Sequence, residues 1–263
     1  MAIKSSVLIT GALTGIGAAY ADRFAKRAHD LVLVARDRSR MEALADRVRR
    51  ETGVHVDILR ADLTDARDLA QVEARLRDDQ RIGILVNNAG TALAGSFVEQ
   101  RADDIAMVIN LNAMAPARLA HAVATRFVKQ GVGSIINIGS VVGLVPEYGS
   151  TVYGATKAFV LFLSQSLNLE LGPKGIYVQA VLPAATRTEI WEHAGKDVNT
   201  LPVVMEVDEL VDAALAGFDR RETVTIPPLP DERQWTAFES ARKAMIPNFS
   251  QARAAERYRN AAS

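Results

Sequence analysis

The amino-acid sequence predicts an α/β fold in which helices cover both faces of a parallel sheet of about seven strands. Short apolar runs alternate with helical stretches along most of the chain, and consecutive parallel strands require helical crossovers of this kind. The first apolar run, residues 6–10, leads directly into a glycine-rich turn and a helix. That succession is the frame that holds a dinucleotide, so we expect a doubly wound, single-domain sheet of the Rossmann type.

The composition excludes several classes of protein. Lys and Arg together number 31, as do Asp and Glu, so no excess charge points to nucleic acid or to an anionic membrane. The chain has no cysteine, which rules out disulfides, thiolate metal sites and cysteine nucleophiles, and no other metal site is predicted. No apolar run approaches the roughly 20 residues that span a bilayer, and no signal peptide precedes the first strand. We therefore expect a cytoplasmic protein without a membrane partner.

Periodicity and turn residues place the individual elements. Strands are predicted at residues 6–10, 31–35, 54–59, 84–86, 134–138, 176–182 and 223–226. Helices are predicted after Gly17, after the caps Ser39 and Thr64, and over 103–129 (with a bend at Pro116), 152–171 and 206–218. Residues 1–228 then form a dinucleotide-binding and catalytic domain. The arginine-rich tail, residues 229–263, is expected to be helical and to pack on the same domain or on a neighbouring subunit.

Three glycines shape the turn that follows the first strand. Gly11, Gly15 and Gly17 allow a sharp change of direction and let backbone N–H groups approach a pyrophosphate at the helix N-terminus. Their spacing is G-x-x-x-G-x-G, which differs from the common G-x-G-x-x-G fingerprint. The position between the first strand and the first helix favours phosphate binding over a turn without a ligand.

A tyrosine and a lysine lie about one turn apart in the helix predicted over 152–171. Side chains at positions i and i+4 share a helix face, so Tyr153 and Lys157 lie on the same side. A phenol near a cation favours its ionised form, which lowers its pKa from about 10. The pair suits proton exchange with a carbonyl/alcohol couple, although the same pattern alone also fits an ordinary amphipathic helix.

Several further motifs make the sequence similar to the short-chain dehydrogenase/reductase family. The resemblance covers about residues 3–226, and it is specific because several motifs occur in the family's order and spacing. The matching motifs are TGALTGIG at 10–17, Asp62-Leu63, NNAG at 87–90, Asn112, Ser140, Tyr153 with Lys157, and Pro183-Ala-Ala-Thr-Arg-Thr188. Two positions depart from the family pattern: Ala184 replaces a glycine and Ala12 replaces a common serine. Neither departure touches the proton chemistry.

The resemblance implies a role for each of four residues. Tyr153 would be the general acid/base, and Lys157 would bind the nicotinamide ribose hydroxyls and lower the pKa of Tyr153. Ser140 would hydrogen-bond the same substrate oxygen. Asn112 would hold a water that links Lys157 to a proton relay. Asn110 is a second candidate for that position, and the phase of the following residues favours Asn112.

The end of the second strand bears on the choice of cofactor. An acidic residue there would accept hydrogen bonds from the adenosine ribose and repel a 2′-phosphate, but the chain has Ala35 followed by Arg36. A guanidinium can pair with a phosphate, so we expect NADP, with NADPH favoured over NADH. Asp37 is the alternative ribose ligand, although it is better placed to cap the next helix. The expected cofactor contacts are Gly11, Thr14, Gly15, Ile16, Gly17, Arg36, Asp62, Leu63, Asn88, Ala89, Gly90, Tyr153, Lys157, Pro183, Thr186 and Thr188.

The expected activity is an NADP(H)-dependent interconversion of a carbonyl and a secondary alcohol by hydride transfer. Apolar side chains in the loop segments that would supply the substrate pocket predict a small, largely apolar substrate: Phe97, Val141, Val142, Leu144, Tyr148, Trp191 and Met205. An alternative is a catalytically silent dinucleotide-binding sensor or scaffold on the same fold. A nucleotide-sugar epimerase is disfavoured, because it would need a longer chain and another glycine spacing. The resemblance also implies a homo-oligomer, a dimer or a tetramer.

Overall fold

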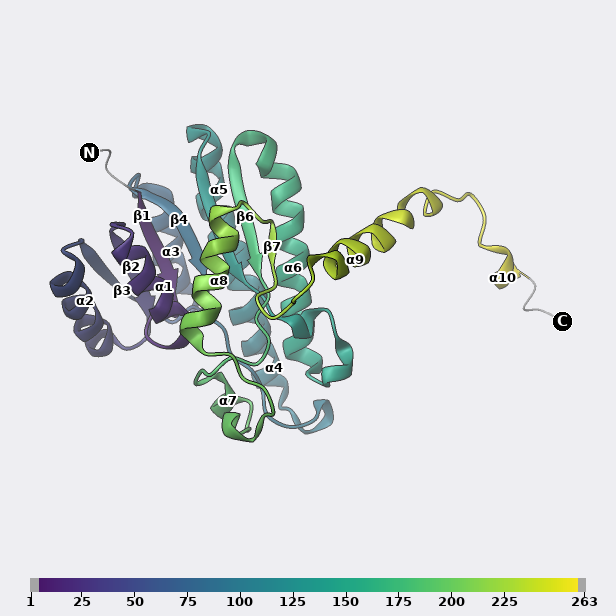
Figure 1. Cartoon of the computed structure of the whole chain (residues 1–263), viewed down its shortest axis with the longest axis horizontal. Helices are drawn as coiled ribbons and strands as arrows, with labels where there is room; N and C mark the ends of the chain where they lie inside the picture. Colours follow the sequence, from purple (N-terminus) through teal and green to yellow (C-terminus); the bar gives the residue numbers. More distant parts are fainter. Residues whose placement is uncertain (1–4, 260–263) are drawn as a thin grey trace. The chain divides into compact units, whose positions relative to one another are not determined.

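Seven parallel strands form one sheet in the computed structural model, which describes residues 5–259 (Figure 1). The strands are β1 (Ser6–Thr10), β2 (Leu31–Ala35), β3 (Val56–Arg60), β4 (Ile82–Asn87), β5 (Gly133–Ile138), β6 (Ile176–Val181) and β7 (Val224–Thr225). Their order across the sheet is β3-β2-β1-β4-β5-β6-β7, and each neighbouring pair is parallel. The direction of winding reverses between β1 and β4, which confirms the predicted doubly wound fold.

Helices cover both faces of the sheet (Figure 1). One face carries α1 (Gly15–Lys26), α2 (Arg38–Thr52) and α8 (Val207–Asp219), and the other carries α3 (Ala66–Asp78), α5 (Ala115–Gln130) and α6 (Thr151–Leu171). Successive residues of β1 point to opposite faces, so Val7 and Ile9 join the first hydrophobic core and Leu8 joins the second. Burial on both sides explains why these strands read as continuous apolar runs.

The structure selects one of the two predicted caps of α2 and shows that the predicted cap of α3 is wrong by one residue. Asp37, and not Ser39, caps α2, because its carboxylate accepts a hydrogen bond from the backbone N–H of Arg40. Asp65, and not Thr64, caps α3 in the same way. A carboxylate satisfies the free N–H groups of a first turn and complements the positive end of the helix dipole.

The helix predicted over 103–129 is three consecutive helical segments. α4 (Ala102–Ile109) passes into a π-helical turn, Asn110–Met114, which continues into α5. Pro116 lies in the first turn of α5, where its missing N–H costs little, so the predicted bend at the proline is not required, and the irregular element is the π turn before it. The extra residue of a π turn changes the direction of the side chains, and this turn carries Asn112.

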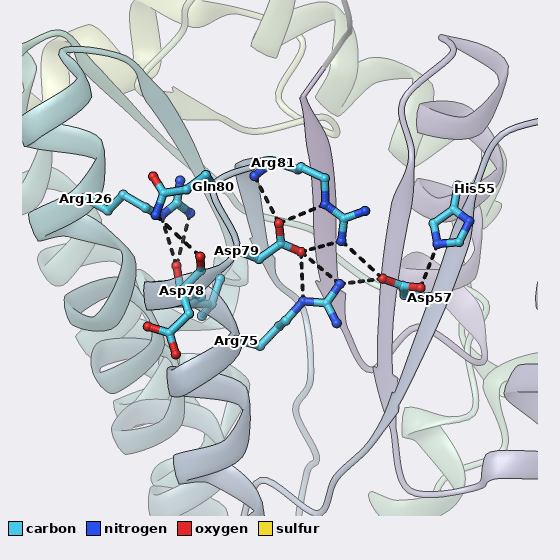
Figure 2. Close-up of polar contacts among 9 residues, drawn as sticks. His55, Asp57, Arg75, Asp78, Asp79, Gln80, Arg81 and Arg126 are labelled. Atoms are coloured by element: carbon cyan, nitrogen blue, oxygen red, sulfur yellow. Dashed lines mark hydrogen bonds and ion pairs between the residues drawn. The ribbon is translucent and has the colours of Figure 1, made fainter.

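An ion cluster lies at the amino-terminal ends of β3 and β4 (Figure 2). Asp79 accepts hydrogen bonds from Arg75 (2.9 Å) and from Arg81 (2.8 and 3.0 Å). Arg75 also donates to Asp57, whose second oxygen lies 2.7 Å from Nε2 of His55. We refer to Asp57, Arg75, Asp79 and Arg81 as the amino-edge cluster. The hydrogen bond from Arg81 is the main reason that the pKa of Asp79 is held well below its usual range.

The last residues form a second unit, Leu229–Ser263, which is separate from the unit Met1–Pro228. Its described part contains α9 (Glu232–Ala244), a 3₁₀ turn at Ile246–Asn248, and α10 (Glu256–Arg259). Trp235 and Phe238 stack one helical turn apart on α9, with ring centroids 5.4 Å apart. No helix within residues 5–259 has the length and the apolar character that a bilayer crossing requires.

Candidate active site

The predicted site residues lie at the carboxyl ends of neighbouring strands. Thr10 ends β1 and Asn87 ends β4, while Ser140 and Pro183 each follow their strand by two residues. Because all strands are parallel, these ends meet along one edge of the sheet, at the point where the winding reverses. This is the edge opposite to the amino-edge cluster.

The turn after β1 is too tight for side chains. Gly11 has a φ of 63°, and a Cβ there would lie 2.9 Å from Cα of Ala89. A Cβ on Gly17 would overlap the carbonyl oxygen of Gly11. The Asn88 amide donates to the carbonyl oxygens of Thr10 and Gly11, both at 3.0 Å, so the loop after β4 braces the turn. The conformational freedom and small size of glycine are therefore required here.

The start of α1 is shaped to receive an anion. Gly15 has a φ of 52°, and a Cβ there would lie 2.9 Å from Cγ2 of Thr188, so Thr188 packs directly over the turn. Thr14 precedes the helix, and its side chain makes no capping bond, while Ile16 packs against the core. The first N–H groups of this 12-residue helix have no intrahelical acceptor. Together with the close-packed glycines, they fit a pyrophosphate.

The two residues after β2 that could contact the adenosine ribose or its phosphate, Arg36 and Asp37, differ in their hydrogen bonds. Arg36 is exposed and forms no hydrogen bond or ion pair with any residue of the described part of the chain. The Asp37 carboxylate is engaged by the backbone N–H of Arg40 at 3.0 Å and by the Ser39 hydroxyl at 2.9 Å. The Asp37 carboxylate therefore caps α2, as predicted, and the Arg36 guanidinium is the group that remains available to a ligand.

The two predicted cofactor contacts in the loop after β3, Asp62 and Leu63, differ in their surroundings. Asp62 accepts hydrogen bonds from the N–H and the hydroxyl of Thr64, at 2.9 and 2.6 Å. Burial works to raise the pKa of Asp62, but these bonds and the positive charge of Arg36 outweigh it and lower the pKa. The Leu63 side chain is buried in the second core, so it contributes to packing rather than to the surface of the site.

Lys157 is buried without a counter-ion. Its side chain is only 5% exposed, and its Nζ donates to the carbonyl oxygen of Ile138 at 2.8 Å. No carboxylate of residues 5–259 lies within ion-pair distance of Nζ, and burial lowers the pKa of Lys157 to about 8. A Cβ on Gly90 would lie 3.6 Å from the ammonium, so Gly90 leaves space beside the charge. An unpaired buried cation is costly, which makes Lys157 a candidate functional residue.

Tyr153 and Ser140 form the candidate proton-transfer pair. A hydrogen bond between the two works to lower the pKa of Tyr153, but burial dominates and raises it to about 12. The Lys157 ammonium lies 5.5 Å from the centroid of the tyrosine ring. The net pKa shift of Tyr153 is thus upward, opposite to the lowering predicted from Lys157, because desolvation outweighs its hydrogen bond with Ser140. The phenol is protonated at neutral pH.

The structure distinguishes the two candidate asparagines. Asn110 is exposed, whereas Asn112 is buried in the π turn. The Asn112 amide exchanges two hydrogen bonds with the backbone of Thr91, at 2.8 and 2.9 Å, and donates to the Thr156 hydroxyl at 3.2 Å. Asn112 therefore ties the loop after β4 to α6 at Thr156, the residue before Lys157.

The segment after β6 returns across the site. Pro183 accepts a hydrogen bond from the Ser140 hydroxyl at 3.1 Å through its carbonyl oxygen. Thr186 is buried and pairs with Met205 in an isolated parallel bridge. The Trp191 indole donates to the Thr186 carbonyl oxygen at 2.7 Å. Two residues predicted to line a substrate pocket, Trp191 and Met205, are thus packed by this segment, and Met205 touches the first core.

Other predicted pocket residues are open to solvent. Phe97, after β4, is 56% exposed, and Tyr148, just before α6, is 62% exposed. Three further residues that were expected to line the pocket follow Ser140 in the turn after β5. They are partly buried: Val141, Val142 and Leu144. Phe97 and Tyr148 thus expose aromatic surface in the loops after β4 and β5, at the edge of the sheet that also carries Ser140.

Sequence reasoning gave no role to three threonines that organise this edge. The Thr10 hydroxyl accepts hydrogen bonds from the N–H groups of Asn88 and Ala89, both at 3.0 Å. Thr91 and Thr156 hold the two ends of Asn112. The sequence could have indicated such a role in only one way. A polar residue at a position expected to be buried needs a hydrogen-bond partner, and here that position lies next to a recognised motif. In residues 5–259, no cluster of His, Asp and Glu has the arrangement of a metal site.

Comparison with known proteins gives a consistent family. Residues 5–199 match the model of the short chain dehydrogenase family. A short-chain dehydrogenase from Sphingobium yanoikuyae, solved in complex with NADPH, is 66% identical and superposes with a TM-score of 0.95, over 96% of this chain and 98% of that one. A bulky-bulky ketone specific alcohol dehydrogenase from Comamonas testosteroni is 60% identical with a TM-score of 0.91, over 97% and 99% of the two chains.

Curated relatives are more distant. Sulfoacetaldehyde reductase 2 from Chromohalobacter salexigens is 34% identical over 251 residues, which are 88% of this chain and 96% of that protein. Hydroxysteroid dehydrogenase-like protein 1 from Gallus gallus is 32% identical over 185 residues, or 70% of this chain. That alignment spans only 56% of the longer Gallus gallus protein.

Proposed function

Since the chain belongs to the short-chain dehydrogenase family, we propose that it is an NADP(H)-dependent oxidoreductase that interconverts a carbonyl and a secondary alcohol. The observation that carries the proposal is the buried ammonium of Lys157 beside the Tyr153–Ser140 pair. A catalytically silent binding protein would have no need of an unpaired buried charge next to a phenol. The glycine turn after β1 lies along the same edge of the sheet and fits a dinucleotide.

The residues present suit the proton step of carbonyl reduction. The bound nicotinamide would supply the hydride, so the chain must bind the carbonyl oxygen and protonate it. Ser140 donates a hydrogen bond to that oxygen, and the protonated phenol of Tyr153 transfers its proton to it. Lys157 would hold the ribose hydroxyls of the bound cofactor, and its charge would stabilise the phenolate that remains, because a cation nearby favours the ionised form.

We assign the cofactor preference to Arg36. Its guanidinium is exposed and forms no hydrogen bond or ion pair with the described residues, so a 2′-phosphate can bind it without breaking an existing ion pair. The NADPH complex of the 66% identical Sphingobium yanoikuyae enzyme supports this choice. Asp37 would repel a second negative charge, but its two hydrogen bonds hold it at the start of α2.

The substrate we propose is a ketone with apolar groups on both sides of the carbonyl. Phe97 and Tyr148 expose aromatic surface from two loops beside the site, which suits large apolar substituents. The Comamonas testosteroni enzyme, 60% identical to this chain, acts on bulky-bulky ketones according to its description. Ketone reduction is also the direction in which a protonated Tyr153 is the required form.

We further propose a homo-oligomer, a dimer or a tetramer, assembled through α6. Phe159, Phe162 and Leu169 expose large apolar side chains on this helix, and Phe162 and Leu169 are 72% and 79% exposed. Such groups are commonly covered by a second copy of the same surface in a two-fold assembly. Light scattering at micromolar concentration tests this, and a monomer would exclude it.

The activity test is NADPH consumption with a series of ketones, followed by absorbance. Wild type should oxidise NADPH with ketones that carry two bulky groups. If it binds NADPH but reduces no carbonyl compound and oxidises no alcohol in the reverse assay, the chain is a dinucleotide-binding sensor. If it binds neither cofactor, the assignment of the glycine turn fails as well.

A further inference from the structure

We propose that Arg187 is a positioning residue that braces the segment from Thr186 to Glu206 over the cofactor site. The inference rests on the proposed function, because the groups that it positions are those assigned to the cofactor. Arg187 lies between Thr186 and Thr188, both expected cofactor contacts, yet its own side chain points to neither. Nothing in the sequence distinguishes it from an ordinary surface arginine.

The Arg187 guanidinium joins three parts of this segment. Its Nε donates to Oε1 of Glu206 at 2.9 Å, and a terminal nitrogen donates to Oδ1 of Asn199 at 2.8 Å. The Arg187 backbone N–H donates to the carbonyl oxygen of Met205 at 3.0 Å. Asn199 is itself held by the Asp197 carboxylate, which accepts from its backbone N–H and its side-chain amide at 2.9 and 3.0 Å. The Arg187 side chain therefore adds to the backbone bonds that tie the outgoing and returning limbs together.

The braced segment reaches the cofactor site at defined points. Thr188 packs over Gly15 in the glycine turn after β1, since a Cβ on Gly15 would lie 2.9 Å from Cγ2 of Thr188. Farther along, Gly195 approaches the loop after β4, where Ala94 lies 3.0 Å from the position of a Cβ on Gly195. The segment contains only a four-residue helix, α7 (Ile190–His193), and a 3₁₀ turn at Val198–Thr200, so little regular structure holds it in place.

A planar guanidinium with several donors suits this task better than an ammonium. Arg187 uses two different edges for two acceptors, which a single-point charge on lysine cannot reproduce in the same geometry. Its side chain is 45% exposed and that of Glu206 is 62% exposed, so water screens the pair. We therefore expect Arg187→Ala to weaken NADPH binding by about threefold to tenfold, rather than to abolish it.

The experiment uses the full chain with Trp235→Phe, which leaves Trp191 as the remaining one of the two tryptophans. Trp191 sits inside the braced segment and donates to the Thr186 carbonyl oxygen. In this background, Arg187→Ala should increase the quenching of Trp191 fluorescence by acrylamide before any cofactor is added. It should also raise the NADPH dissociation constant and the KM for the ketone, with kcat at saturation changed by less than about twofold.

Two variants control the measurement. Arg220→Ala removes an exposed arginine with a comparable ion pair, 2.7 Å to Glu222, at the far end of α8, and should change neither quenching nor NADPH affinity. Arg187→Lys should lie between wild type and Arg187→Ala. Unchanged quenching and affinity in Arg187→Ala would overturn the inference, and so would a fall in kcat alone. Failure of the wild-type chain to bind NADPH would instead refute the proposed function.

Discussion

The two edges of the sheet differ in whether their charged side chains form ion pairs. At the amino edge, every charged group of the amino-edge cluster has an opposite charge within hydrogen-bond distance (Figure 2). At the carboxyl edge, Lys157 is buried with a backbone carbonyl oxygen as its partner, and the exposed Arg36 forms no hydrogen bond or ion pair with residues 5–259. Pairing within the chain supports the fold, whereas charge left unpaired by the chain is available to a ligand.

Removing the Arg36 side chain should lower the affinity for NADPH without lowering the stability of the chain. Arg36→Ala is expected to reduce NADPH affinity by roughly tenfold to a hundredfold, the value of a charge-assisted contact to phosphate. NADH binding and the melting temperature should stay the same. Arg38→Ala is the matched control, since Arg38 lies two residues away and is paired with Glu42 at 2.9 Å. Equal losses for both cofactors would transfer the ribose contact to Asp37.

Lys157 should destabilise the folded chain in a pH-dependent way. Its pKa falls from 10.5 to about 8 on folding, so the unfolded chain binds more protons between these values, and stability from this group rises as pH increases. Between about pH 7.5 and about pH 9.5, this term should change by about 2 kcal/mol. Urea unfolding of wild type and Lys157→Met at both pH values measures it. The wild-type chain should gain stability relative to the variant at the higher pH, and parallel curves would contradict the buried charge.

The amino-edge cluster should show the smallest effect; at neutral pH its charges should stabilise the folded chain, whereas the Lys157 charge destabilises it. Asp79→Asn leaves Arg75 and Arg81 with a neutral partner and should cost about 1 kcal/mol of stability at neutral pH. Because the pKa of Asp79 is lowered on folding, its contribution is full above its ordinary value and is lost as the pH falls below about 4. Chemical denaturation at neutral and acid pH should show the two chains converging in acid. A constant difference would mean that the pairing is not electrostatic.

Local pattern was sufficient for most of the fold because β1, β2, β4, β5 and β6 are largely buried on both faces. The predicted bounds of β1 and β2 match the structure, and β5 differs by one residue. The cap of α2 was left between two residues and that of α3 was misplaced because neighbouring Asp, Ser and Thr all favour such positions, and only the hydrogen bonds distinguish them. The glycine turn was predictable for the same local reason, since its φ angles demand glycine.

Quantities that depend on distant parts of the chain were not predictable. The pKa of Tyr153 was expected to fall beside Lys157, but burial, which the sequence does not report, raises it. The bracing role of Arg187 was not predicted, because its acceptors Asn199 and Glu206 lie 12 and 19 positions away in the sequence. The π turn that buries Asn112 and exposes Asn110 also left no mark that periodicity alone could detect.

The contrast between the edges is tested most directly by NADPH oxidation with a bulky ketone in wild type, Tyr153→Phe and Asp79→Asn, with each chain shown to be folded. Tyr153→Phe removes the proton donor and should lower kcat by on the order of a hundredfold or more while NADPH still binds. Asp79→Asn, at the opposite edge, should keep kcat within about twofold of wild type while unfolding at lower urea concentration. Turnover of Tyr153→Phe within a few-fold of wild type, or a comparable loss in a folded Asp79→Asn chain, would contradict the assignment of chemistry to one edge and stability to the other.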